Sequence, residues 1–310
     1  MESTLATRTA PSVSSDVNPY WWSAAFASQL VICVLGAVGS ALSIFSVKLS
    51  KKMHEGMALQ FNLFFFTFLI ICVVILPTSL VDEYYTLNGW QEKHTGLYVA
   101  LQTVFGSFER NVFGLIAVYR LMAMCFPIWF KLLSRPAVVL AVDLLLFLGV
   151  VALWLFVFLT ETDQTDVGNP STSDRGFAMY CFTLFMPIVV TISAYSTMLV
   201  IRARKRRAAS AGEGHASLDS VSFAVGITIL ANILLDVPHI LIHFRETKST
   251  DLCFVVVHVF YRAHFALDPL CFVACNGAYR EEIRARGLAW LREAAARVSA
   301  VAAAARGSSA

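Results

Sequence analysis

The sequence predicts an all-α fold, a seven-transmembrane helix bundle with a short amphipathic helix after the seventh span. Of the 310 residues, 57% are hydrophobic and only 15% are charged, which is too few charges to cover a water-soluble globule of this size. Seven apolar stretches are long enough to cross a bilayer as a helix, which takes about 20 residues. Lys and Arg also gather in alternate connections, as they do in membrane proteins.

Each apolar stretch is expected to form one helix, because only a helix satisfies its backbone hydrogen bonds internally in lipid. The first, second and fifth stretches carry no charge, whereas the other four each hold an ionisable residue. In chain order the stretches are Ser23–Val47, Met57–Val81, Thr95–Phe126, Ala137–Thr160, Gly176–Ile201, Ser220–Phe244 and Leu252–Asn276.

The orientation follows from the basic residues between these stretches. Sixteen Lys and Arg lie on the side that holds residues 48–52, 131–135, 202–207 and the C-terminal tail, and only five lie on the other side. Because cytoplasmic loops retain positive charge, the N-terminus is expected outside the cell and the C-terminus inside. Because these basic residues lie at the membrane edges, no nucleic-acid partner is expected.

The chain is expected to have three parts. Residues 1–19 form a disordered extracellular segment, residues 20–276 form the seven-helix domain, and residues 277–310 form a cytoplasmic amphipathic helix and tail. In the last part, Tyr279, Ile283, Leu288 and Trp290 alternate with arginines, a pattern typical of a helix lying on the inner leaflet.

Ionisable residues inside the predicted spans are the most informative feature, because they are costly in lipid unless paired or hydrated. In the sixth span four polar residues recur on one helical face, and in the seventh two pairs stand four residues apart. Glu109 and Arg120 of the third span point to the same interior side, with Arg110 a quarter-turn away. The residues of the last two spans are Asn232, Asp236, His239 and His243, and His258 with Arg262 and His264 with Asp268.

Six motifs occur in the order found in one receptor family. They are NLFFF from Asn62, IAVYRLMAMCFP from Ile116, Pro187 with Tyr195, Pro238, DPLCF from Asp268 and NGAYREEI from Asn276. Together they resemble the rhodopsin-like (class A) G-protein-coupled receptors. The resemblance implies a plasma-membrane receptor, not an enzyme, that transduces an extracellular small ligand to a heterotrimeric G protein.

The chain is a divergent example of this pattern. Tyr119 replaces the acid before the helix 3 arginine, and Thr67 replaces the helix 2 aspartate. Asp236 stands where a tryptophan is usual, and Phe272 replaces the tyrosine of the last motif. These departures affect the expected signalling mechanism more than the fold.

The resemblance assigns an activation switch to the inner half of the bundle. In the family, the helix 3 arginine pairs with an acid at rest and swings toward the helix 5 tyrosine when active. Because Tyr119 cannot pair with Arg120, raised basal activity is expected. The alternative is an Arg120 that only anchors the helix at the membrane edge. The switch residues are Arg120, Tyr119, Tyr195, Asp219, Asp268, Pro269 and Phe272.

By the same resemblance, a sodium ion or a proton is expected among Glu109, Asp268 and Thr67, since oxygen ligands suit hard cations. The alternative is an internal salt-bridge network in which Glu109 or Asp236 pairs with Arg110 or Arg262.

The ligand cavity is expected in the outer half of the bundle. His and Arg side chains there suit a carboxylate or phosphate, which favours a small anionic ligand or a lipid acid. Membrane lipids are the other expected partners. The cavity residues are Gln102, Thr103, Asp236, His239, His243, His258 and Arg262.

Other functions remain open at this stage. The histidines can make the protein a proton sensor, since histidine titrates near neutral pH. A receptor-like protein that binds without coupling to a G protein is a further alternative. Less favoured is a seven-helix membrane hydrolase or transporter, for which His239, His243, His264, Asp236 and Asp268 would supply a metal site.

Overall fold

The computed structural model describes residues 19–49, 53–87, 95–160, 174–209, 220–244 and 251–275, together with short helical pieces between residues 280 and 297. Within these ranges the regular structure is helical, with no strand. Residues 1–18, Asp219 and most of residues 276–310 lie outside the described residues. The predictions of a disordered N-terminus and an amphipathic last helix therefore stay predictions.

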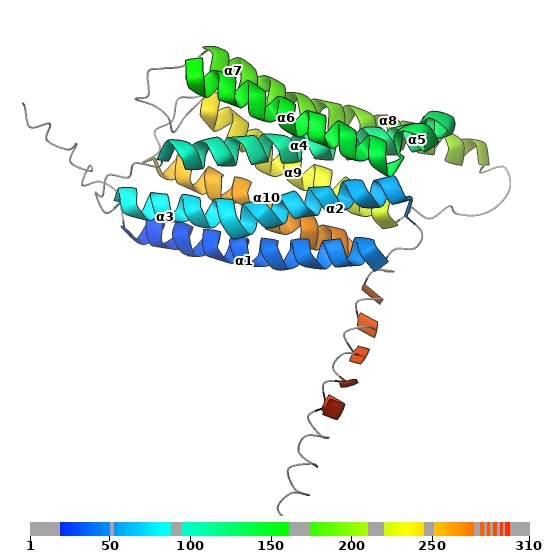
Figure 1. Ribbon diagram of the computed structural model, residues 1–310, viewed down its shortest axis with the longest axis horizontal. Helices are drawn as coiled ribbons and strands as arrows, with labels where there is room; N and C mark the ends of the chain where they lie inside the picture. The colour runs from blue at the N-terminus through cyan, green and yellow to red at the C-terminus, as the bar shows by residue number, and fades with distance from the viewer. Residues whose placement is uncertain are drawn as a thin grey trace, which may run out of the picture.

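The helices run side by side along the long axis of the molecule (Figure 1). The α2, η1 and α3 segments form one continuous rod, and α7, η4 and α8 form another. We call the two ends of the bundle the Pro19 end and the Cys275 end, after residues that lie there. The helices are α1 (Pro19–Leu49), α2 (Glu55–Ile70), η1 (Ile71–Ile75), α3 (Leu76–Leu87), α4 (Thr95–Cys125), α5 (Pro127–Leu133), α6 (Pro136–Thr160), α7 (Asp174–Tyr180), η4 (Cys181–Phe185), α8 (Met186–Ala209), α9 (Ser220–Phe244) and α10 (Leu252–Cys275).

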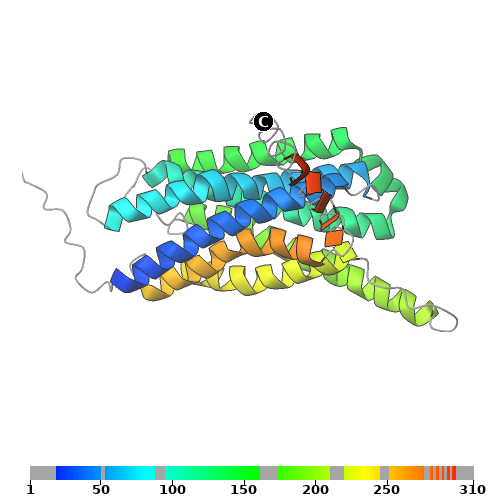
Figure 2. The same cartoon turned by 90° about the horizontal axis from the view of Figure 1, so that it is seen from below.

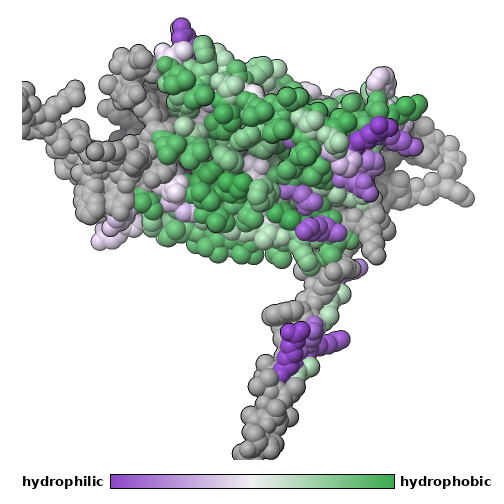
Figure 3. Space-filling view, in the orientation of Figure 1, coloured by the Kyte–Doolittle hydropathy of each residue, from purple (hydrophilic) through white to green (hydrophobic). Residues whose placement is uncertain are grey.

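Five helical rods are long and apolar enough to cross a membrane, which indicates a membrane-embedded protein. They are Tyr20–Leu49, Glu55–Val81, Pro136–Thr160, Arg175–Arg204 and Leu252–Cys275. Apolar side chains cover the middle of the molecular face in Figure 3, and hydrophilic ones gather toward the Cys275 end. The other two predicted spans are helical as α4 and α9, but α4 carries three charged residues and the described apolar part of α9 covers only Gly226–Ile242.

The helices pack around an aromatic core. Helix α10 lies between α1 and α9 (Figure 2), and α4 packs on α2, α6 and α8. The core is rich in phenylalanine because α2 places four of these rings toward its neighbours. Stacked and edge-to-face ring pairs join α2 to α4 and α10 through Phe61, Phe64, Phe65, Phe68, Phe113, Phe265 and Phe272.

Two π-helical segments, which the sequence pattern did not predict, each end just before a proline. Proline has no N–H and its ring clashes with the carbonyl four residues earlier, so a wider turn before it relieves the clash. In η4, Met186 donates its N–H to the carbonyl of Cys181, and Pro187 follows. The Thr183 carbonyl, which Pro187 cannot serve, accepts instead from Asn111 Nδ2 of α4 at 3.0 Å. This hydrogen bond ties η4 to α4.

Helix α1 approaches α10 closely at Gly36. A Cβ atom at this position would lie 2.4 Å from Cys72 Sγ and 2.9 Å from the carbonyl oxygen of Phe265. That carbonyl stands four residues before Pro269, so it too lacks the usual helical donor. Ser43 of α1 donates to the Pro269 carbonyl at 2.9 Å. The contact needs a glycine because any side chain would separate the two helices.

Candidate functional site

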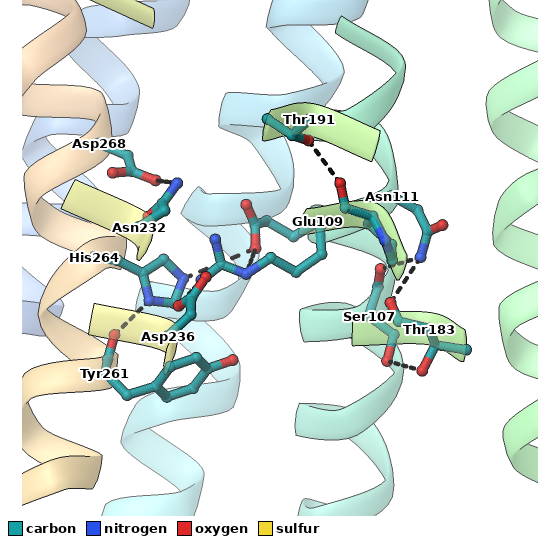
Figure 4. A network of polar contacts seen from close by, with 12 residues as sticks. Ser107, Glu109, Asn111, Thr183, Thr191, Asn232, Asp236, Tyr261, His264 and Asp268 are labelled. Carbon is teal, nitrogen blue, oxygen red and sulfur yellow. Dashed lines mark hydrogen bonds and ion pairs between the residues drawn. The ribbon is translucent and has the colours of Figure 1, made fainter. Parts of the chain in front are cut away.

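A buried ionic cluster joins α4, α9 and α10 in the middle of the bundle (Figure 4). Arg110 of α4 donates through NH2 to Asp236 Oδ1 of α9 at 2.7 Å, and its Nε lies 3.3 Å from Glu109 Oε2. His264 Nε2 of α10 stands 3.8 Å from the same Glu109 oxygen. We call these four residues the ionic cluster. It matches the predicted salt-bridge network, with Arg110 as the cation.

Arg110 was predicted to point a quarter-turn away from Glu109 on α4, yet its long side chain brings the guanidinium back to Glu109. Arg110 shares the buried interior with Glu109, and both are almost fully shielded from solvent. An arginine reaches several ångströms from its Cα, so the direction of the Cα–Cβ bond alone does not place the guanidinium. The guanidinium also lies 5.9 Å from the centre of the Tyr261 ring.

Carboxylates outnumber cations in this region. Asp268 of α10 accepts from Asn232 Nδ2 of α9 at 3.0 Å, beside the ionic cluster in Figure 4. Glu109 Oε1, Asp236 Oδ2 and Asp268 Oδ1 each receive no hydrogen bond from the described part of the chain. Three acids thus surround one arginine, and buried charges of this kind are costly unless protons, cations or donors compensate them.

His264 is held by its own helix. Its Nδ1 faces the backbone carbonyl of Tyr261, a contact that fixes Nδ1 as the donor. The other ring nitrogen, Nε2, therefore points at Glu109 with a lone pair unless a second proton is present. At 3.8 Å the two atoms are too far apart for a hydrogen bond, and neither receives one from the described part of the chain.

The predicted ligand residues form a second polar group nearer the Pro19 end. Arg262 of α10 donates to Ser79 Oγ at 3.3 Å, and that hydroxyl faces Gln102 Oε1 of α4 at 3.4 Å. Ser79 of α3 was not among the predicted ligand residues, since a lone serine in an apolar run carries no signal by itself. Thr103 is partly buried on the same stretch of α4 as Gln102.

Aromatic and histidine rings stack beside this group. His239 Nδ1 lies 3.3 Å from the Tyr180 hydroxyl, and its ring stacks on Tyr261 with centroids 3.7 Å apart. His258 packs edge-on against His239 at 4.8 Å. The side chain of His243 lies outside the described residues. Asp236 belongs to the ionic cluster and not to this ring stack.

A separate hydrogen-bonded group, which the sequence analysis missed, joins α4, α6 and η4. Trp154 donates Nε1 to Ser107 Oγ at 3.0 Å, and Ser107 faces Thr183 Oγ1 at 3.2 Å. All three side chains are buried. In the sequence, a tryptophan within an apolar run looks like an ordinary core residue. Its hydrogen-bonding role becomes visible only from the contact with Ser107 in the structure.

The three residues of the predicted cation site are buried and lie on α2, α4 and α10. Thr67 donates to the Leu63 carbonyl of its own helix at 2.9 Å. Among the described residues, no group of three or more His, Cys, Asp and Glu side chains is arranged to hold a metal ion. A sodium ion or proton at Glu109, Asp268 and Thr67 stays a prediction.

The switch residues lie toward the Cys275 end. The guanidinium carbon of Arg120 stands 5.8 Å from the centre of the Phe61 ring. Tyr119 is buried and donates its hydroxyl to the Leu133 carbonyl of α5 at 3.5 Å. Tyr195 packs over Gly226 of α9, where an added Cβ would lie 3.1 Å from its hydroxyl. Pro269 and Phe272 are buried in α10.

A further buried acid, Asp143, lies toward the Cys275 end and is hydrogen-bonded to another helix. Gln60 Nε2 of α2 donates to Asp143 Oδ1 of α6 at 2.9 Å. Both side chains are buried, so this bond ties the two helices together away from α9.

A groove runs between α8 and α9 and reaches the ionic cluster. Its floor includes Arg110, Asp236, Asn232 and Thr191. Its walls are the apolar side chains of Phe113, Pro187, Ile188, Ile192, Ile229 and Ile233. Helix α9 packs closely on α10 but only lightly on α8, which leaves the groove open on that side.

Comparison with known proteins adds no relative. Neither a search against protein-family models nor a search of curated proteins finds a match to this chain. What the chain does therefore has to be inferred from the ionic cluster and the arrangement of the helices.

Proposed function

We propose that the chain is a divergent receptor of the rhodopsin-like kind, with seven membrane spans and the Pro19 end facing outward. It would transduce a small extracellular ligand to a heterotrimeric G protein at the Cys275 end. The observation that carries the proposal is the Arg110–Asp236 ion pair, because this buried pair joins α9 to α4 across the centre of the bundle.

The ion pair supplies a two-state element of the kind that signalling requires. Asp236 stands two residues before Pro238, where the helical ladder is interrupted and α9 can bend. With the pair formed, α9 is held toward α4. With the pair broken, the half of α9 near Tyr195 and Gly226 is free to move away and admit a transducer at the Cys275 end.

The ligand would be an anion or lipid acid recognised near the Pro19 end. Arg262 is buried and points a guanidinium donor at Ser79, beside the Gln102 amide. A carboxylate takes up several such donors at once, which is the geometry that arginine favours. His258 and His239 would complete the site. A receptor that binds this ligand without coupling to a G protein is the alternative.

Basal activity would be raised. Tyr119 is committed to the Leu133 carbonyl and offers Arg120 no charge. Loss of a resting ion pair worth about 1–2 kcal/mol shifts a two-state equilibrium about tenfold. Ligand-free second-messenger output above vector controls, and its loss in Arg120→Ala at equal surface expression, tests this point.

The central test compares two matched substitutions of buried acids. Asp236→Asn weakens the pair to α4 and should raise ligand-free signalling about tenfold above wild type. Asp143→Asn changes a buried acid that joins α2 to α6, so it should leave ligand-free signalling unchanged. Equal signalling in wild type and Asp236→Asn, at equal surface expression, would remove the proposed mechanism.

The anion site has its own test. Arg262→Gln keeps hydrogen-bonding capacity but removes the charge, so responses to a panel of fatty acids and dicarboxylic acids should fall at least tenfold in potency. Unchanged potency of an active acid in Arg262→Gln would remove the anion-anchor role.

A proton sensor is the second candidate, favoured by the contact between His264 and Glu109. The groups around Glu109 are Arg110 on its own helix, Asp236 on α9, and Tyr261, His264 and Asp268 on α10. A change of external pH without ligand would then alter signalling in wild type but not in Glu109→Gln. A pH response that persists in Glu109→Gln would assign the sensing elsewhere.

A further inference from the structure

The outer surface beside the groove between α8 and α9 is apolar. Next to its wall residues, the exposed side chains are Val189 and Val190 on α8, and Leu230 and Leu234 on α9. At 1.5 Å per residue, Asp236 stands about 12 Å from the Phe244 end of α9 and about 24 Å from its Ser220 end. A molecule in this groove would therefore enter sideways from the hydrocarbon region.

Two residues that line the groove each carry a buried acceptor atom that lacks a donor. Asp236 Oδ2 and Asn232 Oδ1 receive no hydrogen bond from any described group, although both side chains are more than nine-tenths buried. Thr191 donates its own hydrogen to the Pro187 carbonyl at 2.8 Å, which leaves its hydroxyl oxygen able to accept. An unsatisfied buried acceptor costs about 1–3 kcal/mol, so a ligand that donates there is favoured.

The only described cation on the floor is already engaged. Arg110 contacts Asp236 at 2.7 Å and Glu109 at 3.3 Å, so an anionic head group would meet two carboxylates beside one guanidinium. Moving a cationic head group to this depth through the hydrocarbon region costs a large free energy. A neutral hydroxyl costs much less to bury and supplies the missing donor.

The size of the groove limits the head group. Its enclosed part has room for about one water-sized group, and isoleucine, phenylalanine and proline side chains line the rest. A hydroxyl fits the enclosed part, while an alkyl chain or ring system lies along Ile188, Ile192 and Ile233.

We propose that this groove binds a neutral membrane lipid that carries a hydroxyl head group, with the hydroxyl donating to Asp236 Oδ2. The site lies apart from the anion site at Arg262 and does not depend on the receptor proposal, because binding can be measured without signalling. If both proposals hold, the lipid would modulate the Arg110–Asp236 pair through the second oxygen of Asp236.

The test uses the purified full chain in nanodiscs and three matched photoreactive probes. These are a long-chain alcohol, its methyl ether and the corresponding fatty acid, each carrying the same diazirine. The alcohol should label α8 and α9 peptides saturably, and unlabelled alcohol should compete. The methyl ether lacks the donor and should bind at least about tenfold more weakly, the loss expected for a hydrogen bond to a charged acceptor.

Two substitutions on α9 give a control for the binding position. Ile233→Trp fills the groove and should reduce alcohol labelling at least tenfold, whereas Leu241→Trp adds the same side chain at an exposed position that does not line the groove and should not. Thermal unfolding of both variants verifies folding. Labelling that is not saturable, equal labelling by alcohol and ether, preferential labelling of these peptides by the acid, or equal loss in both Trp variants would each overturn the proposal.

Discussion

Trp154 on α6 shows how a single polar contact can orient a buried side chain inside an apolar bundle. It is fully buried, and its one N–H reaches Ser107 of α4 at 3.0 Å. Tryptophan usually needs such a partner when it is buried, so the contact fixes both the ring and the helix pair. Arg110 and Asp236 do the same for α4 and α9 with charged groups.

Trp154→Phe should lower the free energy of unfolding by about 1 kcal/mol beyond the loss of packing, since hydrogen bonds between membrane helices contribute about 0.6 kcal/mol on average and up to about 1.7. Thermal unfolding in detergent measures the effect. The double variant Trp154→Phe with Ser107→Ala should be less destabilised than the sum of the two single variants. Additive losses would show that the hydrogen bond contributes nothing.

Some site residues could be found from the sequence and others could not. Helical spacing correctly placed Glu109, Asp236 and Asp268 in the interior, because four-residue periodicity defines a face. The same spacing wrongly placed Arg110 apart from Glu109. Helical periodicity gives the direction of the Cα–Cβ bond, and a long flexible side chain can bend away from that direction. Ser79 and Ser107 gave no signal, since their roles come from partners on other helices.

At the level of elements, proline sets the irregular parts of the bundle. The positions of Pro77 and Pro187 are visible in the sequence, but the π-helical turns before them are not. Whether a helix kinks, widens or breaks at proline depends on which neighbouring group donates a hydrogen bond to the carbonyl four residues earlier. For Thr183 that neighbour is Asn111, on a helix more than 70 residues away.

Two glycines in helices should respond in opposite ways to alanine. Gly36→Ala places a Cβ against Cys72 and the Phe265 carbonyl and should cost about 1–3 kcal/mol, as overpacking does. Gly149 of α6 meets no described atom within 4 Å, so Gly149→Ala should be neutral or stabilising by up to about 1 kcal/mol. Thermal unfolding of the two variants side by side measures both. A stable Gly36→Ala would contradict the close approach of α1 and α10.

The short helix α5 was not anticipated from the sequence. Phe126 precedes it and Pro127 begins it, because proline is favoured in the first turn of a helix. Ile128 and Trp129 are exposed, and the helix buries none of its residues. The third predicted span ends at Phe126, and the residues after it are assigned to a connection in the sequence analysis, since seven residues are too few to show a helical period clearly.

For the whole molecule, the sequence predicts the number and orientation of the spans from apolar length and basic residues. The structure places each predicted span in a helix, and five of the rods are apolar enough to cross a bilayer. Two of the three charged side chains that lower the hydropathy of α4, Glu109 and Arg110, belong to the ionic cluster. The ionic cluster therefore makes this helix less apolar than the five rods.

The orientation has a direct chemical test. Cys253 is exposed at the Pro19 end, whereas the other six cysteines are buried or partly buried. A membrane-impermeant maleimide should therefore label intact cells through Cys253, and Cys253→Ser should abolish that labelling. Labelling that appears only after permeabilisation would reverse the predicted orientation.

The hydrogen bond from Asn111 to the Thr183 carbonyl has a consequence for how the bundle would come apart. It joins η4, the segment that leads into α8, to α4 four residues before Pro187, while α9 keeps its broad contact with α10. Mechanical or thermal stress would then divide the bundle into two rigid halves, α4 with α8 and α9 with α10. The seam between these halves, which is lined by isoleucines and crossed by the Arg110–Asp236 pair and the Tyr180–His239 contact, is where the protein would part first.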